Sequence, residues 1–178
     1  MNSARQQKLR DLIRNVPDFP KPGIQFKDIT PLLDSPKGFA LAIEAMVDAC
    51  PRDIDAVAGI ESRGFIFGAP MALAMGTGFV PIRKPGKLPY HVYEESFELE
   101  YGESVLNMHV DALREGERVL LVDDLLATGG SLVAAKHLVE RAGAVVVHVA
   151  VLIELLELGG RARLTEQGVT NFSSALQL

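Results

Sequence analysis

The chain has 178 residues, of which 48% are hydrophobic, and a formal net charge of −5. That length and apolar content predict one soluble globular domain with a sizeable core. The acidic balance, with 18 Lys and Arg against 23 Asp and Glu, argues against a polynucleotide partner. Because the N-terminus has no apolar signal core and no stretch approaches the ~20 apolar residues that cross a bilayer, we expect a cytoplasmic protein without a membrane partner.

The N-terminal part of the chain carries two patterns. Residues 1–16 place Leu9, Leu12, Ile13 and Val16 at helical spacing, which predicts an amphipathic helix. The proline-punctuated segment FPKPGIQFKDI, residues 19–29, follows it. Further along, the lone Cys50 lies in the apolar run AIEAMVDAC, so we expect a buried thiol rather than a catalytic one, and no internal disulfide.

Beyond this region, apolar strands alternate with helical segments. We expect helices at 39–50, 64–76 and 131–143, strands at 56–60, 78–82, 104–110, 118–124 and 144–155, and an irregular polar loop at 83–102. The strands lack clean polar alternation, as strands covered on both faces do. The fold class predicted is therefore α/β, with a mostly parallel central sheet and helices on both faces.

Polar residues follow three of the expected strands. The segments are GIESRG after residue 58, PIRKPGK after residue 80 and VDDLLATGGS after residue 121. In open parallel sheets, ligands bind beyond the carboxyl ends of the strands. These three segments are therefore the candidate site.

The segment VDDLLATGGS predicts a sugar-phosphate site. Thr128, Gly129, Gly130 and Ser131 open an expected helix, whose first amides lack partners and attract phosphate. Two carboxylates would repel that phosphate, but they accept hydrogen bonds from vicinal hydroxyls such as those of ribose. A ribose 5-phosphate satisfies both features. The simpler alternative is that Asp124 only caps the loop.

Other phosphate and metal motifs fit the letters less well. A P-loop requires a lysine after its last glycine, and none follows Gly129 or Gly130. The dinucleotide fingerprint is absent as well. A magnesium phosphatase or a receiver domain would use strand-end acids but would not predict the Thr-Gly-Gly-Ser turn.

The stretch VLLVDDLLATGGS resembles the phosphoribosyl diphosphate signature of type I phosphoribosyltransferases. Three further segments, FPKPGIQFKDITPLL, GIESRGFIFG and IRKPGKLPY with LEYG, are similar to the branch that acts on adenine. The resemblance implies a glycosyltransferase (pentosyltransferase) that moves the 5-phosphoribosyl group of 5-phosphoribosyl 1-diphosphate to adenine, giving AMP and diphosphate in purine salvage. It also implies Mg²⁺ as cofactor, held mainly by substrate and water rather than by a protein metal cage, and a homodimer.

The resemblance assigns roles along the chain. Residues 1–34 become a helix and a base-binding hood, and residues 83–103 a flexible catalytic loop that excludes water. The family also has an unusual cis peptide in the loop after residue 60. The residues implied are Gln25, Phe26 and Lys27 for adenine; Glu61, Ser62, Arg63, Arg83, Lys84 and Lys87 for diphosphate; Asp123, Asp124, Ala127, Thr128, Gly129, Gly130 and Ser131 for ribose 5-phosphate; and Glu100, Arg63 and Lys84 for catalysis.

Two alternatives stay open. One is a phosphoribosyltransferase for another base, such as hypoxanthine, xanthine or orotate. The other is a non-catalytic regulator that senses phosphoribosyl diphosphate. From the residues alone, a core residue is the favoured interpretation of Phe26, ahead of a base-stacking one, and Glu100 is one acid among four in its loop.

Overall fold

The computed structural model describes residues 3–99 and 102–178 and divides the chain into two compact units, Met1–Ala45 and Met46–Leu178. The helix α3 (Pro36–Asp48) runs across the boundary between them. Within the described residues, no helix is both long and apolar enough to span a membrane.

The first unit contains short helices and one strand pair. Its elements are α1 (Ser3–Arg10), β1 (Arg14–Pro17), β2 (Gln25–Asp28) and α2 (Thr30–Asp34). The expected helix over residues 1–16 is therefore shorter than predicted, because Val16 lies in β1 and is paired with Phe26 of β2. Leu9 is buried, as its place in the apolar pattern indicated.

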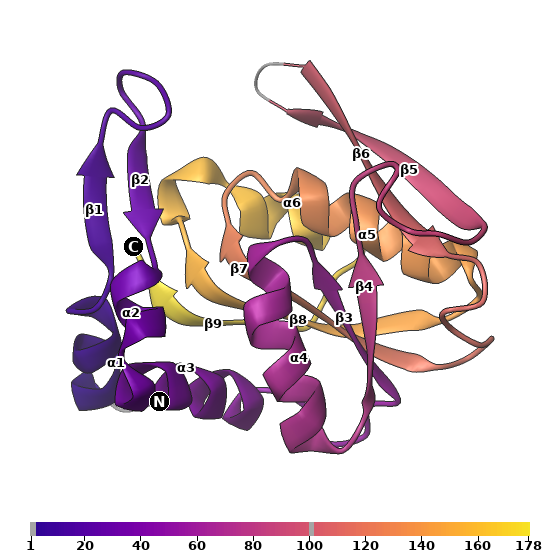
Figure 1. Cartoon of the computed structure of the whole chain (residues 1–178), viewed down its shortest axis with the longest axis horizontal. Helices are drawn as coiled ribbons and strands as arrows, with labels where there is room; N and C mark the ends of the chain where they lie inside the picture. The colour runs from indigo at the N-terminus through magenta and orange to yellow at the C-terminus, as the bar shows by residue number, and fades with distance from the viewer. Residues whose placement is uncertain (1–2, 100–101) are drawn as a thin grey trace. The chain divides into compact units, whose positions relative to one another are not determined.

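The second unit is built on a five-stranded parallel sheet in the order β4-β3-β7-β8-β9 (Figure 1). Its strands are β3 (Ala56–Ile60), β4 (Gly78–Ile82), β7 (Arg118–Leu126), β8 (Val145–Glu154) and β9 (Phe172–Gln177). Every residue of β3 is buried, as is most of β7 and β8. The predicted α/β class with a parallel sheet is confirmed.

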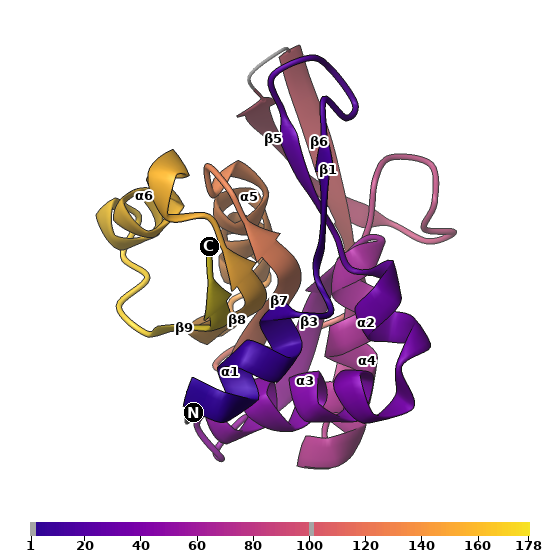
Figure 2. The same ribbon diagram turned by 90° about the vertical axis from the view of Figure 1, so that its left-hand side faces the viewer.

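Helices cover both faces of this sheet. Helix α4 (Arg63–Met75) connects β3 to β4, and α5 (Gly130–Arg141) connects β7 to β8 in the opposite direction along the sheet. Because parallel crossovers are right-handed, two crossovers in opposite directions place their helices on opposite faces, as Figures 1 and 2 show. A short turn η1 (Leu156–Leu158) and α6 (Gly160–Glu166) then lead from β8 to β9 on the α5 side.

The region expected as an irregular loop at 83–102 is partly a strand. Residues Val92–Leu99 form β5, which pairs antiparallel with β6 (Gly102–His109). The prediction of an irregular segment was wrong for β5, where the side chains alternate: Tyr93 and Phe97 pack against the buried core, while Glu94 and Glu98 are exposed. This period-2 pattern was available in the letters but was obscured by the four glutamates around it.

The β5–β6 pair is attached to α5. Glu95 lies 2.9 Å from Nδ1 of His137, and the Arg141 guanidinium donates to the Glu94 carbonyl at 3.1 Å. The same guanidinium lies 5.1 Å from the centre of the Tyr93 ring, within cation–π range. These contacts fix one face of the pair on the helix that begins at the Thr-Gly-Gly-Ser turn.

Candidate active site

The strands β3 and β7 are neighbours whose connections leave in opposite directions, so a crevice opens beyond their carboxyl ends. This is the topological switch point at which open α/β sheets bind ligands. Glu61, Ser62 and Arg63 follow β3 there, and Asp123 and Asp124 lie in the last part of β7. Strand β7 continues two residues beyond the predicted end, to Leu126, and contains both acids as predicted.

Arg63 and Asp124 meet across this crevice. Nε of Arg63, in the first turn of α4, lies 3.0 Å from Oδ2 of Asp124. Gly64 allows the approach, because a β-carbon there would lie 2.9 Å from the Val122 carbonyl and 3.0 Å from Oδ1 of Asp123. The glycine after Arg63 is therefore a packing requirement between α4 and β7.

Burial controls the charge of the two acids. Asp124 is 3% exposed, and burial raises its pKa although the Arg63 guanidinium opposes the shift. The pKa of Asp123 is raised well above its ordinary value, first by burial and then by the negative charge of Asp124. Among the described residues, Oδ2 of Asp124 has no hydrogen-bond donor with good geometry. Buried acceptors normally have one, so this oxygen is suited to a ligand hydroxyl.

The turn after β7 exposes the amides of α5. Gly129 is the N-cap residue with φ of 83°, a backbone conformation that favours glycine. No side chain in the described chain caps this helix start, so its first amides remain available to an anion. The predicted phosphate-binding turn, Ala127 to Ser131, is thus adjacent to the two acids.

Helix α4 begins at the same edge of the sheet. The peptide bond between Glu61 and Ser62 is cis, as the resemblance implied. Ser62 is the N-cap residue of α4 and makes no side-chain capping hydrogen bond there. Two helix N-termini therefore border one crevice, which gives it positive potential from backbone groups on both sides.

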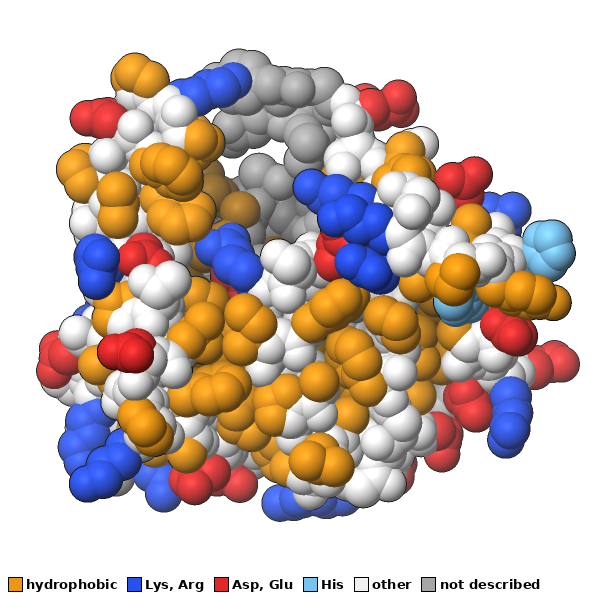
Figure 3. All heavy atoms as spheres, viewed as in Figure 1, with side chains coloured by type: hydrophobic (Ala, Val, Ile, Leu, Met, Phe, Trp, Pro, Cys, Tyr) orange, Lys and Arg blue, Asp and Glu red, His pale blue; other side chains and the backbone are white. Residues whose placement is uncertain are grey.

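A cluster of charges lies between the ends of β3 and β4. The Glu61 carboxylate accepts hydrogen bonds from Nε of Arg83 and Nζ of Lys87, each at 2.8 Å. Burial by itself would raise the pKa of Glu61, but these hydrogen bonds and one from the Lys84 amide lower it. Lys and Arg side chains gather over the end of β4 in Figure 3, and Lys84 is exposed. Glu61 therefore holds the Arg83 and Lys87 side chains in place, and its own negative charge is unsuited to binding a diphosphate.

The structure brings together the predicted residues that belong to the second unit. Those of the second unit, from Glu61 to Ser131, lie at the carboxyl ends of β3, β4 and β7. The predicted catalytic Glu100 lies outside the described residues. Gln25, Phe26 and Lys27 form β2 in the first unit, where Gln25 and Lys27 both bind the Asn15 side chain. Phe26 is half-buried and packs edge-to-face on Phe19 at 5.0 Å.

Two groups outside the predicted site behave as the sequence indicated. Burial raises the pKa of the Cys50 thiol to about 12, which confirms an inert buried cysteine. His148 is a strand residue whose Nε2 lies 2.8 Å from Oγ of Ser173. Burial lowers the pKa of His148, so this imidazole is neutral at pH 7.

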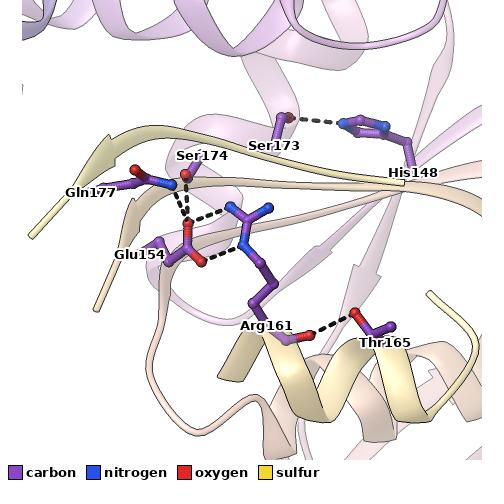
Figure 4. Close-up of polar contacts among 7 residues, drawn as sticks. All are labelled: His148, Glu154, Arg161, Thr165, Ser173, Ser174 and Gln177. Atoms are coloured by element: carbon purple, nitrogen blue, oxygen red, sulfur yellow. Dashed lines mark hydrogen bonds and ion pairs between the residues drawn. The ribbon is translucent and has the colours of Figure 1, made fainter. Parts of the chain in front are cut away.

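A third group, around Glu154 at the end of β8, was not predicted. Glu154 is 2% exposed and accepts hydrogen bonds from Nε and Nη2 of Arg161, Oγ of Ser174 and Nε2 of Gln177 (Figure 4). No motif marked it, although a glutamate at the end of the apolar run VVVHVAVLIE is a signal for a paired buried charge.

Comparison with known proteins identifies the family of this chain. A model of the phosphoribosyl transferase domain matches residues 29–169, so the chain belongs to the phosphoribosyl transferase domain family. Within it, the chain is 53% identical over 174 residues to the adenine phosphoribosyltransferase of Cutibacterium acnes, and the match covers 98% of each chain.

Solved structures agree with that relationship. The crystal structure of adenine phosphoribosyltransferase from Rhodothermus marinus is 52% identical with a TM-score of 0.93, covering 99% of this chain and all of that one. The enzyme from Saccharomyces cerevisiae, complexed with D-2,5-dideoxy-2,5-imino-altritol 1,6-bisphosphate and adenine, is 37% identical with a TM-score of 0.90, covering 98% and 100%.

Proposed function

We propose that this protein is an adenine phosphoribosyltransferase, which transfers the 5-phosphoribosyl group from 5-phosphoribosyl 1-diphosphate to adenine and releases AMP and diphosphate. The observation that carries the proposal is the crevice between β3 and β7. It combines the half-buried Asp123 and buried Asp124 carboxylates, an uncapped helix start with the Thr-Gly-Gly-Ser turn, and the ion pair of Arg63 with Asp124. The near-complete match to relatives named for adenine supports the choice of base.

The ribose 5-phosphate occupies the β7 side of the crevice. Its phosphate accepts hydrogen bonds from the first amides of α5 and from the hydroxyls of Thr128 and Ser131. Its two ring hydroxyls donate to Asp123 and Asp124. Because such donors stabilise the charged carboxylates, binding offsets the burial that raises their pKa values in the free protein.

The diphosphate leaves toward the β3 side. Ser62 and Arg63 at the start of α4 contact it, together with the cations Arg83, Lys84 and Lys87. Displacement at the anomeric carbon creates a cationic sugar ring and a highly charged leaving group. Preorganised donors for developing charge are usually the largest catalytic contribution, and here Glu61 holds two of the cations in place.

Magnesium fits the residues present as a substrate-bound ion. Within residues 3–99 and 102–178, no cluster of three or more His, Cys, Asp or Glu side chains could hold a metal by itself. Mg²⁺ keeps much of its water and binds phosphate oxygens readily, so Asp123 and Asp124 would hold it through water or the ribose hydroxyls. When bound, the ion neutralises charge on the leaving diphosphate.

The base is recognised by the β2 segment. We assign adenine to Gln25, Phe26 and Lys27, with the Phe26 ring as the stacking surface and backbone groups for the base edge. A base with a different pattern of donors and acceptors would leave a buried polar group unpaired, which would weaken its binding by about 1–3 kcal/mol. Glu100 takes or returns the purine proton, and residues 83–103 close over the reacting atoms.

The cellular setting follows the family resemblance. The protein acts in purine salvage in the cytoplasm, and it works as a homodimer. In that dimer, the basic residues after β4 lie near the neighbouring active site. Sedimentation of the purified chain at micromolar concentration tests the dimer, and a single monomeric species would contradict it.

The decisive assay for the reaction is chromatography of products after incubation with Mg²⁺, phosphoribosyl diphosphate and each purine base in turn. AMP from adenine, with little product from hypoxanthine, guanine or xanthine, is the expected result. Product from a different base would support the assignment of phosphoribosyl diphosphate to the crevice and contradict the assignment of adenine to β2. Bound phosphoribosyl diphosphate with no product from any base would indicate the sensing regulator instead.

A further inference from the structure

Helix α6 packs against the turn that binds the phosphate. A β-carbon on Gly160, the first residue of α6, would lie 2.2 Å from the Ala127 carbonyl oxygen, and one on Gly129 would lie 3.2 Å from the Gly160 carbonyl oxygen. The two backbones are therefore in direct contact through glycines. Any side chain in the first turn of α6 that points toward α5 lies close to the phosphate-binding amides.

Arg163 is such a side chain. Its Nη1 would lie 3.6 Å from a β-carbon on Gly130, the first residue of α5. Arg163 is half-buried, yet within the described part of the chain no hydrogen bond or ion pair to its guanidinium is found. A cation beside an uncapped helix start adds to the positive potential there.

The Glu154 cluster fixes α6 in this position. Arg161 and Arg163 are two residues apart on α6, so their side chains leave the helix in different directions. Arg161 is bound to the buried Glu154 carboxylate, which also accepts from Ser174 and Gln177 of β9 (Figure 4). This anchor ties the start of α6 to the end of the sheet.

We propose that Arg163 is a further ligand of the 5-phosphate, held beside the turn by the Glu154–Arg161 anchor. The inference rests on the proposed function, because it assumes that the turn binds the 5-phosphate of ribose. Arg163 adds a charge-assisted hydrogen bond from a side chain of α6, whereas the other donors are backbone amides of α5. Glu154 and Arg161 are positioning residues in this account and do not touch the substrate.

The test is calorimetric titration of ribose 5-phosphate and, separately, of pyrophosphate, which has no 5-phosphate group. Arg163→Gln should weaken ribose 5-phosphate about ten- to a hundredfold, as expected for a lost charge-assisted hydrogen bond, and leave pyrophosphate within about twofold. Arg163→Lys should restore most of the affinity. The matched control is Arg114→Gln, which removes an exposed arginine at the opposite end of the strands.

The outcomes separate the two claims. If the unaltered protein binds ribose 5-phosphate and Arg163→Gln binds it equally well, the inference is overturned and the proposed function stands. Equal weakening of ribose 5-phosphate and pyrophosphate would also overturn it, because the effect would then be general charge. If the unaltered protein binds no ribose 5-phosphate, the proposed function fails and the role of Arg163 fails with it.

Discussion

Nε of Arg63 lies 3.0 Å from Oδ2 of Asp124, and this ion pair joins the first turn of α4 to the end of β7. It joins the two chain segments that border the crevice, one assigned to diphosphate and the other to ribose. The Arg63 side chain is 36% exposed while that of Asp124 is 5% exposed, so the arginine bridges the interior and the ligand space. The same ion pair therefore contributes to the stability of the fold and positions two residues that are assigned to ligand binding.

Removing Arg63 should destabilise the fold and weaken diphosphate binding together. Arg63→Gln leaves the Asp124 carboxylate buried without its cation, and we expect a loss of about 1–3 kcal/mol in the free energy of unfolding. Urea denaturation at pH 7.5 measures it. The double variant Arg63→Gln with Asp124→Asn should lose less than the sum of the single variants. Strict additivity would show that the ion pair makes no contribution.

Replacing Asp123 should have the opposite effect on stability. The folded pKa of Asp123 is raised, so the folded state binds more protons than the unfolded state above about pH 4, and stability falls as pH rises through that range. Asp123→Asn removes this penalty. Its melting temperature should exceed that of the unaltered protein at pH 8, and the difference should shrink toward pH 4. A lower melting temperature at pH 8 would mean that the carboxylate is stabilised by its surroundings.

Glu154 should stabilise the fold in a pH-dependent way. Hydrogen bonds from Arg161 first, and then from Ser174 and Gln177, lower its pKa against the effect of burial. A carboxyl with a lowered folded pKa contributes stability above its unfolded pKa, near 4.5, and loses it as pH falls through the folded value. Glu154→Gln should cost about 1–3 kcal/mol at pH 7 and less at pH 3. A cost that does not depend on pH would assign the effect to packing.

Gly160 should tolerate no side chain. Gly160→Ala places a methyl group against the Ala127 carbonyl and the Leu126 side chain, so α6 or the phosphate-binding turn must move. We expect a loss of about 1–3 kcal/mol, typical of overpacking, and a raised KM for phosphoribosyl diphosphate. Gly78→Ala is the control, because a β-carbon at Gly78 would meet no atom within 4 Å. Equal behaviour of the two variants would contradict the close contact between α6 and the turn.

The sequence predicted best the elements that are short apolar runs between turn-forming residues. Strands Ala56–Ile60 and Gly78–Ile82 have the predicted bounds, since their apolar residues lie between turn-forming neighbours. β5 was missed because glutamates occupy its exposed positions. β9, FSSALQ, was missed because a strand at the sheet edge needs few apolar residues, and its pairing with β8 is evident only in three dimensions.

The site residues that lie together in one segment of the sequence were predictable. The acids, the Thr-Gly-Gly-Ser turn and the arginine after β3 are contiguous with strand ends, so their approximate meeting place followed from the topology of parallel sheets. Contacts between distant residues did not follow. The pairing of Glu61 with Arg83 and Lys87 and of Arg63 with Asp124, and the position of Arg163 beside the start of α5, depend on how distant backbone segments approach one another.

The measurement that tests the central claim most directly is AMP formation from adenine and phosphoribosyl diphosphate by the unaltered protein and by the double variant Asp123→Asn with Asp124→Asn. The account predicts AMP from the unaltered protein and a rate at least about a hundredfold lower from a double variant whose circular dichroism shows it to be folded. Equal rates from the two proteins would contradict the claim that the reaction takes place between β3 and β7.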